Sequence, residues 1–160
     1  MATKAHSELI ARHINALKKV EGKKVEAGWF ESDRYPADIS NSVGEQVAKI
    51  ARIQEWGATI KRGNAEIVIP SRAFMRKAWS DFNQQRAAIQ VKVAKKVVNG
   101  EITQDQALAQ IGEALVACIV RSIRGGEWER NAASTIKQKG FDKPLINTAH
   151  MWKTVNSKVS

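Results

Sequence analysis

The C-terminal run GEWERNAASTIKQKGFDKPLINTAHMWKTVNSKV constrains the fold of this chain more than any other segment. It holds three structural signals in fixed order: a turn with a tryptophan, a short basic helix ended by a glycine, and a Lys-Pro-Leu-Ile-Asn-Thr corner. The corner starts a last helix that runs into a terminal strand. None of these pieces resembles an active site. Their density of caps and breakers is typical of a segment that holds a shape and contacts neighbours.

The same signals give the expected bounds. Asn131 is expected to cap a helix over residues 132–139, which Gly140 closes. Pro144 prevents further helix, because proline has no backbone N–H to donate. Beyond this corner we expect a helical turn from Thr148 to Trp152 and a strand over residues 155–160.

Composition and length favour one globular domain over residues 1–160. The chain has 160 residues, of which 43% are hydrophobic and 26% charged, and a chain of this length buries roughly 70% of its unfolded surface. We find no run of about 20 apolar residues and no secretory signal, so we expect a soluble protein with no membrane partner, made in a cytoplasm. Cys118 lies in an apolar run and is expected to be a buried thiol.

Periodicity predicts the elements before the C-terminal run. An amphipathic helix over residues 6–19 belongs to a segment, residues 1–22, that we expect to be peripheral. Alternation predicts a strand near residues 24–30 and a hairpin over residues 59–69, with an exposed loop at 32–41. The remaining predictions are a helix over 43–56 capped by Ser42 and Glu45, a helix over 72–98 capped by Ser71, and a buried helix beginning at a Thr103–Gln106 capping box. Together they predict an α+β fold, with a small, mainly antiparallel sheet of about four strands packed against several helices.

A formal charge of +10 is the one unusual global property. A solvated helix face and a contact with DNA or an acidic protein explain the basic excess between residues 62 and 96 equally well. The basic residues there are Arg62, Arg72, Arg76, Lys77, Arg86, Lys92, Lys95 and Lys96, against Glu66 and Asp81.

A search for catalytic groups gives a negative result. His6 and His13 are seven residues apart on one expected helix, which separates them by about 10 Å, too far for one metal ion. Cys118 in an apolar helix is a poor nucleophile for a dyad with His150. Glu55 is a candidate buried carboxylate without a partner acid. We therefore expect no enzyme, no cofactor and no metal site.

The segment at residues 69–76, IPSRAFMR, is a candidate binding anchor. It joins an apolar strand end and a rigid corner to Arg72 and Arg76, which share a helix face. In the alternative interpretation, Phe74 and Met75 only close the core over the hairpin. Tryptophan and arginine dominate protein interfaces, and the chain contains 5 tryptophans, although core packing explains most tryptophans in any fold.

Four segments follow one another in fixed order: VEAGWFE, IQEWGA, IPSRAFMRKAW and the C-terminal run. This order resembles the neck or tail-completion proteins of tailed bacteriophages, a virion-morphogenesis group that joins tail to head. The resemblance covers most of the chain from Lys23 onward. The most recognisable motifs are IPSRAFMR and DKPLINT, at residues 142–148. Relatives have a glycine and a polar residue where this chain has Ala149 and His150, so the turn before the last helix is expected to differ.

The resemblance implies a non-enzymatic virion subunit in the neck or at the head-proximal end of the tail. The expected partners are copies of itself in a hexameric or dodecameric ring, head-connector or portal-side proteins, tail-tube or tail-terminator proteins, and DNA in the channel. Candidate DNA-facing residues are Arg62, Arg72, Arg76 and Lys77. Candidate subunit-interface residues are Trp56, Pro70, Arg72, Phe74, Met75, Arg76, Lys143, Pro144 and Leu145. The alternative function is a basic nucleic-acid-binding protein that uses the region from Arg62 to Lys96.

Overall fold

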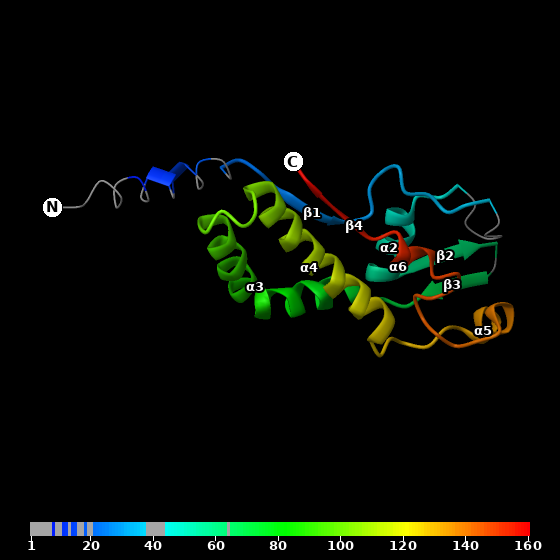
Figure 1. The fold of residues 1–160 in the computed structure, drawn as a ribbon. Coiled ribbons are helices and arrows are strands. Elements are labelled where there is room, and N and C mark those ends of the chain that lie inside the picture. The colour runs from blue at the N-terminus through cyan, green and yellow to red at the C-terminus, as the bar shows by residue number, and fades with distance from the viewer. Residues whose placement is uncertain are drawn as a thin grey trace.

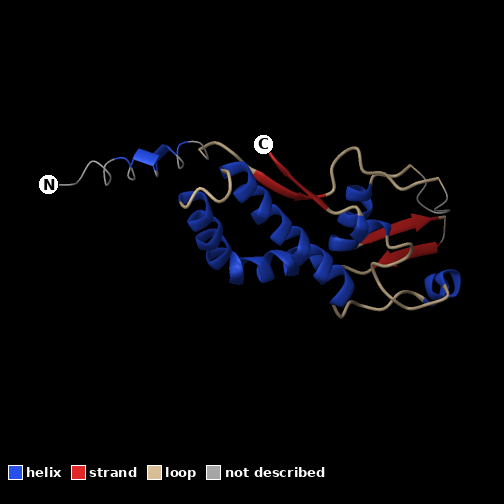
Figure 2. Ribbon diagram, viewed as in Figure 1, coloured by secondary structure: helices blue, strands red, loops and turns tan. Residues whose placement is uncertain are grey.

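The computed structural model of this chain describes residues 21–37, 44–63 and 65–160, with six residues before them (8, 11, 12, 14, 15 and 18). The helix expected over residues 6–19 lies mostly outside the described residues. The α+β prediction is confirmed, with helices and four strands in two antiparallel pairs (Figure 2). The elements are β1 (Val25–Gly28), α2 (Val47–Trp56), β2 (Ala58–Arg62), β3 (Ala65–Ile69), α3 (Phe74–Val98), α4 (Gln104–Gly125), α5 (Ala133–Lys139), α6 (His150–Lys153) and β4 (Asn156–Val159).

The long helices α3 and α4 form the central layer, and the β1–β4 pair lies along α4 (Figure 1). The predicted return of the last strand is confirmed, because β4 pairs with β1 from Val25↔Val159 to Gly28↔Asn156. α4 contacts this pair closely at Gly112, where a Cβ would lie 2.7 Å from Ser157 Oγ. The buried core joins α3 and α4 to α2 and α6 through Val47, Ala51, Phe74, Ala78, Phe82, Cys118, Ile119, Ile123, Met151 and Val155.

α4 is the core helix that the sequence predicts. Its capping box is confirmed: Thr103 Oγ1 accepts from Gln106 N, and the Gln106 side chain accepts from Thr103 N. Among the described helices, α4 alone is long and apolar enough to cross a membrane by length and composition. The search of the sequence for apolar runs missed this property. The core helix of a soluble protein passes the same test, and α4 packs against α3, β1 and β4.

The hairpin β2–β3 projects from the end of the molecule opposite the α3–α4 turn (Figure 1). It pairs with itself and does not join β1–β4 among the described residues, so the four strands form two separate sheets. Gly57 begins the hairpin at φ 74, and a Cβ there would lie 2.7 Å from the Ile69 carbonyl oxygen, which explains the need for glycine. Ile60, Ile67 and Val68 are exposed on it.

Two predicted caps at helix starts are wrong. α2 begins at Val47 after Gln46, with no side-chain cap; Ser42 lies outside the described residues, and Glu45 pairs with Lys49 at 2.7 Å. Ser71 does not cap α3, because its Oγ donates to the Glu55 carbonyl oxygen at 2.7 Å.

The two caps predicted in the C-terminal run are also wrong. Asn131 does not cap α5, because its backbone N and Nδ2 both donate to Asp142. Thr148 does not cap α6, which follows Ala149 in a left-handed conformation at φ 65. The stop of α5 at Gly140 is confirmed. In both cases the helix begins one residue later than the pattern predicts, so that Ala132 and Ala149 occupy the N-cap positions.

The N-terminus of α3 is capped from a distance by Glu55. The residue is 5% exposed, and its carboxylate accepts hydrogen bonds from Met75 N at 2.7 Å and Arg76 N at 3.3 Å. Arg76 Nε donates to the same carboxylate at 2.9 Å. Negative charge is favourable at a helix N-terminus, where backbone N–H groups lack helical partners. Glu55 therefore joins the end of α2 to the start of α3.

Arg72 fastens the corner between β3 and α3. Its guanidinium donates to Gln54 Oε1 at 2.6 Å and to the Glu129 carbonyl oxygen at 3.0 Å. It also donates to the Arg130 carbonyl oxygen at 3.3 Å. Burial lowers the pKa of Arg72, with the charges of Glu129 and Asp142 acting in the opposite direction. Arg72 therefore binds the turn that carries Trp128 to the end of α2.

Replacing Glu55 with alanine is expected to lower the free energy of unfolding by about 2–4 kcal/mol, because two amides and one guanidinium lose a buried acceptor. Glu55→Gln should cost less, since it retains one carbonyl acceptor. Urea denaturation measures both. Glu45→Ala is the matched control on an exposed ion pair and should cost less than about 1 kcal/mol. Equal losses for Glu55 and Glu45 would contradict the capping role.

The Asp142 carboxylate gives the fold a specific pH dependence. Arg130 Nε donates to it at 2.6 Å and Asn131 N at 3.1 Å, and these hydrogen bonds lower its pKa below the usual value. Its contribution to stability is present above the unfolded pKa and is lost as the pH falls through the folded pKa. The unmodified chain should therefore lose more Tm between neutral pH and about pH 3 than Asp142→Asn does. Parallel Tm curves for the two chains would contradict this prediction.

Candidate functional site

An open groove of about 610 Å³ lies between β1, α2 and α3. Its composition is aromatic and basic, with Trp29, Trp56 and Trp79 beside Arg52 and Arg76. Large aromatic and arginine side chains are the residues that contribute most to protein–protein binding. The groove is therefore the candidate functional site, as a surface for a protein partner.

Trp56 and Arg76 form one wall of this groove. Trp56 is 62% exposed, which is unusual for a residue at the end of a core helix, and the Arg76 guanidinium lies 4.4 Å from its ring centroid. Arg76 is held in turn by the Glu55 carboxylate and donates to the Glu55 carbonyl oxygen at 3.3 Å. A cation over an indole ring is attracted to its face. The buried cap of α3 thus fixes the orientation of an exposed arginine and tryptophan.

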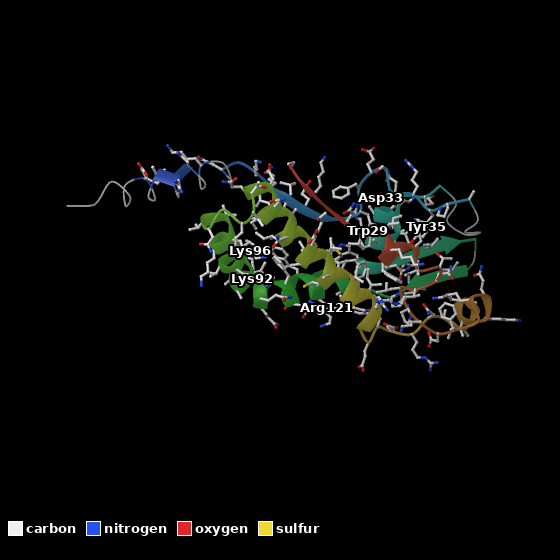
Figure 3. The ribbon with its side chains drawn as sticks, viewed as in Figure 1. Trp29, Asp33, Tyr35, Lys92, Lys96 and Arg121 are labelled. Carbon is white, nitrogen blue, oxygen red and sulfur yellow. The ribbon has the colours of Figure 1, made fainter. Side chains whose placement is uncertain are left out.

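The other two tryptophans rest on the core. Trp29 Nε1 donates to the Met151 carbonyl oxygen at 2.8 Å, and its ring meets Phe74 edge-on at 6.0 Å between centroids. Figure 3 shows Trp29 beside α2 and α6. Trp79 is 50% exposed and stacks on the buried Phe82 at 5.9 Å. All three groove tryptophans are therefore held by contacts with neighbouring residues: Trp29 by Met151, Trp56 by Arg76 and Trp79 by Phe82.

The structure brings together three of the predicted interface residues: Trp56, Met75 and Arg76 all line the groove. Phe74 is 0% exposed, and its ring lies in the core. Arg72 is 4% exposed and donates all its described hydrogen bonds within the chain. The prediction that these two residues face a partner or DNA is therefore wrong. The IPSRAFMR motif does not distinguish these two residues from their neighbours. At the start of α3, Phe74 faces the core and Arg76 faces solvent.

The other predicted interface residues lie outside the groove. Pro70 is half-buried at the end of β3, next to the corner that Arg72 fastens. Lys143 is exposed, and its carbonyl oxygen accepts from Lys139 Nζ at 2.8 Å. Pro144 is half-buried, and Leu145, at φ 62, packs against the core. A subunit contact through these four residues stays a prediction.

The predicted DNA-facing residues differ in their surroundings. The side chain of Arg62 lies outside the described part, and Arg72 is buried. Arg76 belongs to the groove, and Lys77 pairs with Asp81 at 3.3 Å. Among the described side chains between residues 72 and 77, the sequence therefore indicates more free cations than the structure has.

Sequence reasoning missed Trp29, Trp79 and Arg52 as groove residues. The number of tryptophans was the available signal, but the spacing in sequence does not show that positions 29, 56 and 79 converge. Cys118 and His150 have different neighbours: the Cys118 sulfur accepts from Gln85 and Arg121, whereas His150 contacts the Arg34 carbonyl oxygen. Within the described residues, no three His, Cys, Asp or Glu side chains are grouped as metal ligands.

Comparisons with known proteins give no relative for this chain. No protein-family model matches it, and no curated protein does. No solved structure matches its fold.

Proposed function

We propose that this chain is a non-enzymatic structural subunit of a tailed bacteriophage virion, forming a ring that joins tail to head and lets DNA pass. The observation that supports this most directly is that one molecule bears two unlike apolar surfaces. One is the tryptophan groove, and the other is the β2–β3 hairpin with exposed Ile60, Ile67 and Val68. The motif resemblance to neck and tail-completion proteins supplies the place in the virion.

A closed ring requires such a pair of surfaces. In cyclic assemblies of more than two copies, one patch on each subunit meets a different patch on its neighbour. A two-stranded hairpin is marginally stable alone and gains from a covering surface. We therefore assign the ring contact to the hairpin of one copy against the groove of the next.

The groove is suited to binding because little ordering is needed. Arg76 is held by Glu55, Trp29 by Met151, and Trp79 by Phe82. Immobilising side chains on association costs free energy, and a surface that is already ordered avoids that cost. The same rigidity suits contact with head-connector or tail-tube proteins.

Trp56→Ala tests the groove. Since the side chain is largely exposed, the Tm should change by no more than about 2 °C. Association of the purified protein with phage tails or heads, followed by sedimentation, should weaken at least tenfold, as expected for an interface tryptophan. Val68→Asp on the hairpin should have the same effect. Val91→Ala, an exposed apolar residue outside the groove, is the control.

Two results would contradict the proposal. One is unchanged association by both Trp56→Ala and Val68→Asp. The other is failure of the unmodified protein to associate with either heads or tails. A monomer in dilute solution would not contradict it, because such a subunit is expected to assemble on docking.

A further inference from the structure

Four cations follow the seam between α3 and α4: Lys92, Lys95 and Lys96 of α3 and Arg121 of α4. We call them the basic stripe. Lys92, Lys95 and Arg121 are exposed, and Lys96 is half-buried. None of the three lysines forms a salt bridge with a described residue, and α3 contains no acidic residue after Asp81. The distal half of α3 thus carries three lysines that form no ion pair with a described residue.

The seam contacts align these residues. Gln85 Nε2 donates to the Cys118 sulfur at 3.1 Å, and Arg121 Nη2 donates to the same sulfur at 3.2 Å, so Arg121 lies level with Gln85. Lys92 follows Gln85 by two helical turns, and Lys96 comes one turn later. Figure 3 shows Lys92 and Lys96 on α3, with Arg121 farther along the pair on α4. From Gln85 to Lys96 the stripe extends about 16 Å along the helix.

The stripe fits the backbone of duplex DNA better than other polyanions. Duplex DNA carries one negative charge per about 1.7 Å of axis, so 16 Å faces several phosphates at once. Lysines act as point charges that track a backbone without reading bases. Binding of single strands by stacking needs aromatic side chains on the same surface, and the stripe has none.

We propose that the basic stripe binds the phosphate backbone of duplex DNA without sequence preference. This inference deepens the proposed function and rests on it in one respect. The proposed function supplies the source of the DNA, which is the duplex that passes the head–tail junction. It also replaces the DNA-facing set expected from sequence, because Arg72 is buried and Arg76 and Lys77 are engaged with Glu55 and Asp81. Binding is local to α3 and α4, so it is measurable on the purified full chain.

The test is fluorescence anisotropy with a mixed-sequence duplex of about 20 base pairs across a salt series. Four phosphate contacts predict a slope of log Kobs against log salt of roughly −3.6. The triple variant Lys92→Gln, Lys95→Gln, Lys96→Gln should reduce the slope to roughly −1 and weaken binding at least tenfold at low salt. Arg86→Gln is the control, since Arg86 is exposed on α3 about 120° from Lys92, and should weaken binding less than threefold.

Equal effects of the triple variant and Arg86→Gln would overturn the proposal, as would no binding by the unmodified chain. Competition by polyglutamate as effective as that by duplex DNA would overturn it in favour of an acidic protein partner. Thermal unfolding of each variant confirms that the fold is intact. Association with tails or heads separates the two proposals. If the chain associates with tails but does not bind DNA, only the proposal of DNA binding by the basic stripe is contradicted. If it binds DNA but associates with neither tails nor heads, the ring proposal is contradicted.

Discussion

The Glu55 carboxylate is the interaction on which the rest of the structure depends. It is buried at the end of α2, accepts two amide hydrogen bonds at the start of α3, and holds the Arg76 guanidinium. Through Arg76 the Glu55 carboxylate orients the exposed ring of Trp56. The neighbouring residue Gln54 accepts a hydrogen bond from the Arg72 guanidinium. One acidic side chain thereby links the helix before the hairpin to the helix after it. The hairpin is free to project because the chain is fastened at both of its ends.

This arrangement explains how a small core supports both the open groove and the exposed hairpin. α3 and α4 supply most of the buried core, and α2 adds Val47 and Ala51. The groove rests directly on this core, because Ala51 belongs to both. Trp56 and Val68 remain exposed while the corner between them is held by Arg72 and Ser71. Ordered surfaces of this kind lower the free-energy cost of association, which is what the proposed ring requires.

Periodicity predicted the α+β class, the hairpin, the capping box at Thr103 and the final strand, because each depends on residues close in sequence. The partner of Glu55 was not predictable, since Met75 and Arg76 approach it only after the hairpin reverses the chain. Ser71 and Asn131 failed as caps for the same reason, because folding brings an acidic residue to each. Glu55 caps α3 in place of Ser71, and Asp142 accepts the hydrogen bonds of Asn131. Motif reading placed Arg72 and Phe74 with the interface residues. It could not show that the first turn of α3 faces the core on one side and solvent on the other.

The central claim is that each copy meets the next through the groove and the hairpin at the head–tail junction. A cryo-electron microscopy reconstruction of the intact particle, resolved to side chains at that junction, tests it most directly. The account predicts a ring of this chain in which Ile67 or Val68 of one copy lies against Trp56 of its neighbour. A junction that lacks this chain, or a ring in which Trp56 and Arg76 face solvent in every copy, would contradict it.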